Sequence, residues 1–389
     1  MIRETLINPL YVCVILAILN HTFFGGARLN VLLYAADLHA SAALVGLVSS
    51  LFTIPSIFMS VAMGRWTDRA GTRRPMQIGS GLMFAGGLIG FFWRDIVGLG
   101  IASAVIGSAF NLFFIAHQRF TGEFGAPEDR AKNFSMAALG FSTASFLGPI
   151  AAGFFIESFG HAASMLLLSF TALASVAILA LGMRSAAPRR AADKRPKGSM
   201  LALVRQPGML RIYGVSVLAQ STWVIVIFLV PLYGTQIGLS PSSIGMLMGS
   251  FALATIVVRV VLPGLSRKLT PWQLVLLSLS VSALTFLAMP AFKSMGTLAV
   301  LVFWLGLSLG IAGPMSQTLL YDESPPERVG EALGLRVLMM NISHSIVPLF
   351  SGAVSAAYGV APVFWALAAT LLGGCYATRA QWRTDRKRA

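Results

Sequence analysis

Three arginines lie inside apolar stretches that are long enough to cross a membrane, and one of them, Arg259, is only three residues from the end of its stretch, where it is expected to reach the interface. Arg28 falls about two-thirds of the way along the stretch 10–35, and Arg336 lies about two helical turns into the stretch 329–356. A charged side chain inside a bilayer is costly, so each is a candidate functional residue. Because a planar guanidinium group binds carboxylate or phosphate through paired hydrogen bonds, the predicted chemistry is recognition of an anionic or strongly polar substrate.

Further polar side chains accompany these arginines on the same helix faces. His21 precedes Arg28 at helical spacing, and His344 follows Arg336 at helical spacing, with Asn341 alongside. Other polar residues fall at similar depth in neighbouring stretches. The predicted substrate-binding residues are His21, Arg28, Asn111, Gln220, Trp223, Arg336, Asn341 and His344.

Arg28 and Arg336 also have an alternative explanation without a binding role. Arg28 would then reach the outer surface or pair with Asp37. Arg336 would reach the cytoplasmic interface or pair with Glu331 or Asp322. The sequence alone leaves these alternatives open.

The uncharged candidates have alternatives too. Trp223 would face lipid, and Asn111 and Gln220 would be hydrogen-bonded between helices. His21 and His344 would be packing residues, or they would carry protons, because imidazole titrates near neutral pH.

Acidic residues are absent from the middle of every apolar stretch. All 14 Asp and Glu residues fall in loops or near the ends of these stretches. A cavity with Arg and without a carboxylate is electropositive, so it would serve a lipophilic cation poorly. Proton coupling would have to use Asp37, Glu157 or a His, unless the substrate itself carries the proton.

The composition requires that these residues be positioned by membrane-spanning helices. The chain of 389 residues is 56% apolar and 11% charged, whereas soluble domains contain about 25% charged residues. With a mean hydropathy of +0.77, this excludes a soluble enzyme and a disordered chain. Stretches of about 20 apolar residues occur at 10–35, 43–63, 75–93, 96–117, 133–157, 162–183, 208–234, 243–262, 272–291, 296–320, 329–356 and 360–378.

The net charge of +15 is a topology signal, and nucleic-acid binding is not expected. If the N-terminus is inside, most of the 29 Lys and Arg residues fall in inner loops, and only Arg94 and Lys293 fall outside. Short loops rich in Lys and Arg stay in the cytoplasm. We therefore expect both termini to be cytoplasmic, in a multi-pass protein of the bacterial cytoplasmic (inner) membrane.

The two halves of the chain repeat one another. The segment ASAALVG at 40–46 is similar to LSPSSIG at 239–245, and Pro149 recurs as Pro348, at an offset of about 200 residues. Parallel repeats of this kind build some secondary transporters, which bind substrate near the membrane midplane. The predicted fold is all-α, with twelve transmembrane helices in two pseudo-symmetric bundles. The expected domains are an N-terminal six-helix bundle (1–183), a basic cytoplasmic linker (184–206) and a C-terminal six-helix bundle (207–389).

The loop after the second stretch has an ordered pattern. Residues 64–74 read GRWTDRAGTRR, in which Gly64 permits close approach of two helix ends and Gly71 permits a tight turn. Asp68 can cap the following helix. A plain basic loop would not need this order. The string resembles the signature of the major facilitator superfamily (MFS), and the span count, linker and repeat extend the resemblance over essentially the whole chain.

The resemblance implies alternating access, in which two halves rock about a central site. It also implies a cytoplasmic latch that stabilises the outward-open state, formed by Gly64, Asp68, Arg69, Gly71 and Arg73. The second copy, GLSRK at 264–268, lacks the acidic residue. The family's drug/proton antiporters usually carry Arg in span four where this chain has Ser103, so their proton-coupling scheme does not carry over whole.

The fifth stretch contains GFSTASFLGPIAAG at 140–153. Pro149 removes a backbone hydrogen bond, so Gly148, Pro149 and Gly153 are expected to form a helix-break motif. A plain packing face is the alternative. The stretch is similar to the family's antiporter motif, although Ala144 and Ala152 replace two of its glycines, and this favours export.

Other chemistries lack support in the sequence. Cys13 and Cys375 lie in apolar runs near opposite ends, so we expect neither a disulfide nor a metal site. No ATP-binding loop occurs, and we expect no cofactor and no enzymatic activity.

The predicted function is secondary active transport, most consistent with proton-linked efflux of a small anionic or amphipathic metabolite, siderophore or drug. Symport uptake of an organic anion or sugar is the alternative. A sensor or scaffold without transport is disfavoured, because no appended soluble domain is evident. The expected partners are a small-molecule substrate, protons and membrane lipid, and the protein is expected to be a monomer.

Overall fold

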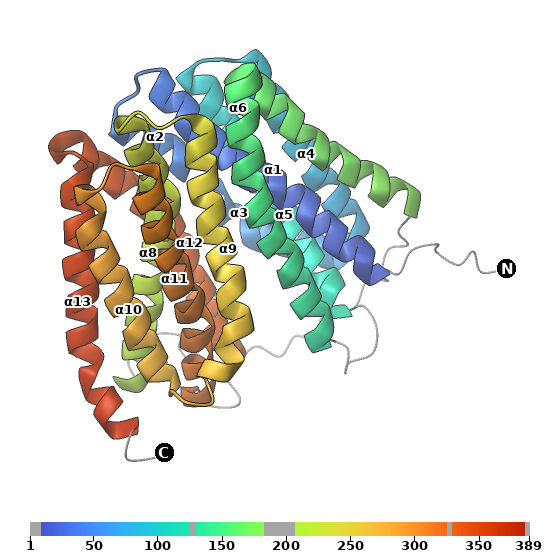
Figure 1. Ribbon diagram of the computed structural model, residues 1–389. Coiled ribbons are helices and arrows are strands. Elements are labelled where there is room, and N and C mark those ends of the chain that lie inside the picture. Colours follow the sequence, from blue (N-terminus) through green and yellow to red (C-terminus); the bar gives the residue numbers. More distant parts are fainter. Residues whose placement is uncertain (1–8, 124–129, 183–206, 325–328, 386–389) are drawn as a thin grey trace. The chain divides into compact units, whose positions relative to one another are not determined.

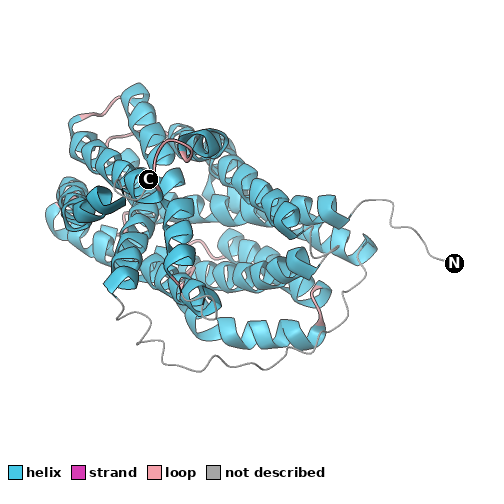
Figure 2. Cartoon of the chain, turned by 90° about the horizontal axis from the view of Figure 1, so that it is seen from below, coloured by secondary structure: helices cyan, strands magenta, loops and turns pink. Residues whose placement is uncertain are grey.

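The computed structural model describes residues 9–123, 130–182, 207–324 and 329–385 of the chain (Figure 1). Within these ranges the secondary structure is helical, with short turns and no strands (Figure 2). The helices are α1 (Pro9–Asp37), α2 (Ala42–Ser50), α3 (Ile54–Ala70), α4 (Arg73–Phe92), α5 (Ile96–Glu123), α6 (Arg130–Gly182), α8 (Pro207–Gln236), α9 (Pro241–Leu265), α10 (Pro271–Ala288), α11 (Met295–Glu323), α12 (Val329–Tyr358) and α13 (Val360–Asp385), with a 3₁₀ turn at Met289–Ala291.

Ten of the described helical stretches are long and apolar enough to cross a membrane. One of them, Met136–Leu181, has 46 residues, enough for two crossings of about 20 residues each. Gly160, with φ 81° and ψ 169°, bends α6 between these crossings. These helical stretches, with Met136–Leu181 taken as two crossings, and α12 together account for all twelve predicted stretches. The protein is therefore an all-α multi-pass membrane protein.

The second predicted stretch, 43–63, differs from expectation because a turn divides it into α2 and α3. Pro55 lies at the start of α3, where its missing N–H costs no hydrogen bond. The turn also needs Gly107 of α5. A Cβ at that position would lie 1.8 Å from the carbonyl oxygen of Phe52, so a larger residue would push the turn away.

The contacts within the chain define two compact units. Unit 1 comprises 1–192 with 234–249, and unit 2 comprises 193–233 with 250–389. The end of α8 and the first part of α9 therefore belong with α1–α6. The predicted linker, 184–206, lies outside the described residues.

Small residues and buried polar contacts hold the helices of unit 1 together. Gly148 lies against α1, where a Cβ would be 2.7 Å from the Thr22 carbonyl oxygen. The Asn20 amide donates to Ser175 Oγ at 2.8 Å and accepts from Ser80 Oγ at 2.9 Å, which links α1 to α6 and α4. All three side chains are fully buried, and the hydrogen bonds between them offset the cost of removing their polar groups from water.

Unit 2 uses similar devices. Ser278 of α10 donates to the Ser308 carbonyl oxygen of α11 at 2.6 Å, and Ser282 lies 2.8 Å from Ser308 Oγ. Tyr213 of α8 is buried and donates to the Ala332 carbonyl oxygen of α12 at 3.2 Å. The Tyr213 contact joins α8 to α12, the two helices that carry the candidate site residues of this unit.

Candidate functional site

Arg28 is half-buried in α1 and is the most unusual charge in unit 1. Its guanidinium carbon lies 5.7 Å from the centre of the Phe24 ring. Among the described residues, no hydrogen bond or ion pair to its guanidinium is found. The alternative pairing with Asp37 is wrong, because the Asp37 carboxylate binds His161 instead.

His21 lies on the same face of α1, as the spacing predicts. Its Nε2 is 3.1 Å from Ser145 Oγ, whereas its Nδ1 is buried and has no partner in the described part of the chain. Its ring lies 5.4 Å from the rings of Phe110 and Phe141. An unsatisfied imidazole nitrogen therefore accompanies the unpaired guanidinium.

Aromatic rings from three helices form a cluster around His21, and one of them, Phe24, also lies beside Arg28. Phe24 of α1 and Phe110 of α5 stack at 4.0 Å with an angle of 12°. Phe114 packs edge-on against Phe141 of α6 at 5.4 Å. All four rings are half-buried. None of these rings was among the predicted site residues, although the helical spacing of Phe110 and Phe114 was a usable signal.

Asn111 does not join this group. Its amide donates to Ser60 Oγ at 2.9 Å and to Met63 Sδ at 3.6 Å, both on α3. The structure thus brings His21 and Arg28 together and directs Asn111 toward a different neighbour.

In unit 2, Gln220 of α8 and His344 of α12 are in contact, with 2.6 Å between the amide nitrogen and His344 Nε2. Either the amide donates to an unprotonated Nε2, or the turned amide accepts from Nε2–H. Trp223 packs edge-on against Phe251 at 4.9 Å. The candidates Gln220 and His344 are therefore coupled to each other, and Trp223 belongs to an aromatic pair.

Arg336 is half-buried in α12, and its Nε is fully buried without a partner among the described residues. No ion pair joins it to Asp322, and the Glu331 side chain lies outside the described part. Asn341 is also half-buried, and no hydrogen bond of its side chain to a described residue is found. Arg28 in unit 1 and Arg336 in unit 2 thus each lie inside an apolar span without an ion pair to a described residue.

The loop pattern predicted to form a latch lies at the α3–α4 turn. Gly71 has φ 76°, which suits glycine, and it ends α3. Arg73 donates to the Leu179 and Ala180 carbonyl oxygens at 2.8 and 2.7 Å, so it caps the end of α6. Arg69 is exposed, the space around Gly64 is open within 4 Å, and the Asp68 side chain lies outside the description.

The predicted break at Gly148-Pro149 is not present in the backbone. The α6 backbone stays helical through Pro149, and its one departure is at Gly160. The motif instead gives close packing within unit 1. Gly153 lies against α9, where a Cβ would be 2.5 Å from the Pro241 carbonyl oxygen.

A family model described as Major Facilitator Superfamily matches residues 10–346 and, in a second match, 214–388. The chain belongs to the Major Facilitator Superfamily. The resemblance inferred from the loop pattern and the span count is therefore confirmed, as is the MFS fold. Members of this family are transporters, so this chain is an MFS transporter with many membrane-spanning helices.

Known relatives and structures agree with this assignment. Multidrug resistance protein MdtG of Escherichia coli (strain 55989 / EAEC) is 25% identical over 351 residues, covering 83% of this chain and 81% of that protein. The crystal structure of the nucleoside transporter NupG has a TM-score of 0.81 at 13% identity and covers 96% of this chain and 99% of its own. A D-xylose-proton symporter has a TM-score of 0.74 at 14% identity, covering 96% and 97%. At these identities the two structures establish the MFS fold alone.

Proposed function

We propose that this MFS transporter exports small anionic or amphipathic molecules, coupled to protons, by alternating access. The observation that carries the proposal is Arg28, a cation inside an apolar span that has no hydrogen bond or ion pair among the described residues. An uncompensated charge in such a place destabilises the empty protein. A bound carboxylate, sulfonate or phosphate would supply the missing counter-ion and the missing acceptors.

The surroundings of Arg28 suit an amphipathic anion. Half-buried Phe rings offer apolar area and ring faces, and the unpartnered His21 Nδ1 offers one further polar contact. A binding pocket for a small molecule combines mostly apolar walls with a few such polar groups. Arg336 in unit 2 supplies a second candidate cation.

Export is supported by the relatedness to a protein named for multidrug resistance and by the resemblance of 140–153 to the family's antiporter motif. The Lys and Arg distribution supports a bacterial cytoplasmic membrane with both termini inside. Uptake by symport is the competing outcome, and the test below distinguishes it.

The test uses bacterial cells that lack their own efflux systems and express this protein. The cells are loaded with the organic anion carboxyfluorescein or the lipophilic cation ethidium, with and without a proton uncoupler. We expect lower retention of carboxyfluorescein, abolished by the uncoupler, and no effect on ethidium. In a second arm, carboxyfluorescein is supplied outside the cells. Accumulation that collapses when the uncoupler is added would establish uptake instead of export.

Matched variants connect the transport to the site. Arg28→Ala and Arg336→Ala should each abolish carboxyfluorescein transport while leaving the amount of folded protein unchanged. Arg211→Ala is the control, because it removes an exposed Arg of α8. Normal transport in both Arg28→Ala and Arg336→Ala would remove the basis for an anionic substrate.

A further inference from the structure

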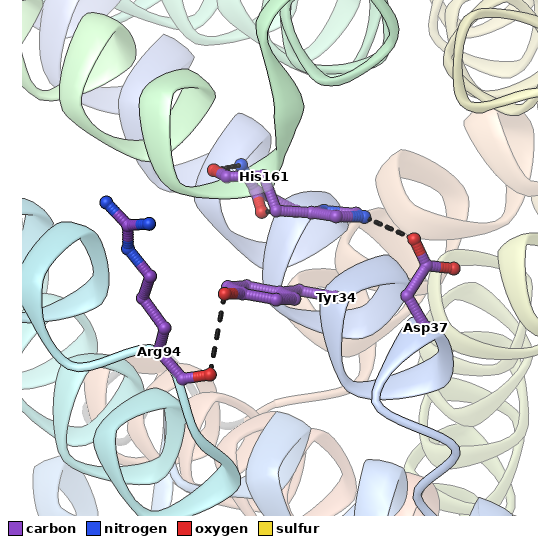
Figure 3. Close-up of polar contacts among 5 residues, drawn as sticks. Tyr34, Asp37, Arg94 and His161 are labelled. Atoms are coloured by element: carbon purple, nitrogen blue, oxygen red, sulfur yellow. Dashed lines mark hydrogen bonds and ion pairs between the residues drawn. The ribbon is translucent and has the colours of Figure 1, made fainter.

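A polar cluster in unit 1 joins the end of α1 to the bend of α6 (Figure 3). His161, directly after Gly160, lies with its Nε2 2.7 Å from Asp37 Oδ2 and its Nδ1 3.3 Å from Asn30 Oδ1. Its ring stacks on Tyr34 at 4.7 Å and 6°. The Asn30 side chain is fully buried. All three of these described partners of the ring lie on α1.

The hydrogen-bond roles in this cluster can be counted. The Asn30 amide nitrogen donates to the His161 carbonyl oxygen at 2.9 Å, and a carbonyl oxygen can only accept. That contact fixes the amide, so its oxygen faces His161 Nδ1. On the other side of the ring, an ionised Asp37 carboxylate can also only accept.

Both ring nitrogens of His161 therefore face acceptors. A neutral imidazole carries one N–H, so one of the two contacts would bring a lone pair against an oxygen. The imidazolium form donates from both nitrogens and satisfies both. The arrangement is the one that a protonated His161 requires.

The environment allows this proton to be gained and lost. The His161 side chain is 11% exposed, and burial opposes its charge, while the Asp37 carboxylate favours it. Asp37 is 65% exposed, so it connects the ring to water. The titratable and charged groups around the ring are Asp37 and Tyr34 on α1 and Arg94 beyond them, whose carbonyl oxygen accepts from the Tyr34 hydroxyl at 3.4 Å.

The remaining nearby carboxylate on α6 is engaged elsewhere. Glu157 Oε2 accepts from the Ser242 backbone N–H at 3.1 Å, within unit 1. Asp37 therefore remains the carboxylate that contacts the ring, and loss of the proton would remove one of the two hydrogen bonds that the ring nitrogens of His161 donate to α1.

We propose that His161, held between Asp37 and Asn30, is the proton-binding site that couples this transporter to the proton gradient. The ligand is a proton taken from the medium that bathes Asp37, which the topology predicted from the sequence places outside. One proton adds to a ring nitrogen and leaves again as a free proton, and no other bond changes. The coupling role depends on the proposed proton-linked transport, whereas proton binding can be measured without any substrate.

The first experiment reads the proton directly. The full chain, labelled with ¹⁵N-histidine and held in lipid nanodiscs, is titrated by NMR, and the His161 signals are assigned by their loss in His161→Gln. We expect both His161 nitrogens to carry protons in the acidic part of the titration, and Asp37→Asn to move the midpoint down by about one pH unit. A His161 that stays neutral wherever the protein is folded, or titrates identically in Asp37→Asn, would overturn the proposal.

The second experiment measures how strongly a pH difference drives transport of carboxyfluorescein. Proteoliposomes containing carboxyfluorescein are given a pH difference of one unit while valinomycin and equal potassium hold the membrane potential at zero. One proton moved per substrate can then sustain a concentration ratio of about tenfold. We expect the wild type and His39→Asn to approach that ratio, and His161→Gln and Asp37→Asn to fall to a ratio near one.

The two experiments separate the proposals. If the wild type moves no carboxyfluorescein, the proposed function fails, and the NMR titration still decides whether His161 binds a proton. If both Asp37→Asn and His161→Gln keep the wild-type ratio, the coupling role is wrong even where the titration succeeds.

Discussion

Replacement of Arg28 by methionine should stabilise the empty protein and remove its response to organic anions. Burial of a cation without a partner costs several kcal/mol. The attraction between the guanidinium and the Phe24 ring at 5.7 Å offsets about 1 kcal/mol of this cost. Because Arg28 is only half-buried and methionine has a similar reach without charge, we expect a net gain of about 1–3 kcal/mol.

The assay is thermal unfolding in nanodiscs, with and without carboxyfluorescein. A ligand at 100 times its dissociation constant stabilises the state that binds it by about 2.7 kcal/mol, so the wild type should unfold at a higher temperature with the anion present. Without the anion, Arg28→Met should unfold at a higher temperature than the wild type. Addition of carboxyfluorescein should not raise its unfolding temperature further. Arg211→Met, at an exposed position, should change stability by less than about 0.5 kcal/mol and keep the anion response.

Two results would refute this reasoning. A loss of several kcal/mol in Arg28→Met would mean that the guanidinium has stabilising partners after all. An anion response that persists in Arg28→Met would mean that the anion binds elsewhere.

Three further variants test the surrounding structure by thermal unfolding. Gly148→Leu should destabilise the protein by about 1–3 kcal/mol, because its Cβ would lie 2.7 Å from the Thr22 carbonyl oxygen, whereas Gly214→Ala, in open space, should not. Arg73→Gln should lower stability by about 1.5–3 kcal/mol, because it removes charged hydrogen bonds to the end of α6. Hydrogen bonds from backbone N–H groups at the start of α5 lower the pKa of Asp95 below its usual 3.8. Asp95 therefore stabilises the fold above its unfolded pKa, and the difference between the wild type and Asp95→Ala should vanish as the pH falls through the lower, folded pKa; a constant difference would contradict this.

The helices were predictable because their signal is local. A run of about 20 apolar residues specifies a membrane span whatever surrounds it. The division of the second span was not predicted, although Pro55 marks it. Its other cause, the space that Gly107 leaves for the Phe52 carbonyl oxygen, depends on a residue from another helix.

The site was predictable only along single helices. His21 and Arg28 share a face because both lie on α1, and spacing alone reveals this. The contact of Asn111 with Ser60 of α3 could not be predicted, since depth in the membrane says nothing about the direction in which a helix faces. The contact between His161 and Asp37 joins residues 124 positions apart, so the sequence offered Asp37 as one candidate for proton coupling without indicating that His161 is its partner.

In the mechanism proposed above, the direction of transport depends on how the proton at His161 and the anion at Arg28 affect each other. Arg28 and Asp37 are nine residues apart on α1, which is about 13 Å along the helix axis. At an effective dielectric constant of about 20, a proton gained at His161 attracts an anion at Arg28 by roughly 1 kcal/mol. Charge alone thus favours binding of both together, which is the arrangement of a symporter.

Export therefore requires that the proton act through the shape of the protein, with an effect larger than this attraction and opposite to it. Because His161 connects the bend of α6 to α1, protonation of His161 would change the conformation there and so weaken anion binding. Carboxyfluorescein affinity measured in nanodiscs on both sides of the His161 titration gives the answer. We expect weaker binding to the protonated protein and no pH dependence from this group in His161→Gln. If carboxyfluorescein binds severalfold more tightly to the protonated protein, the charge attraction dominates, and the protein would be an importer.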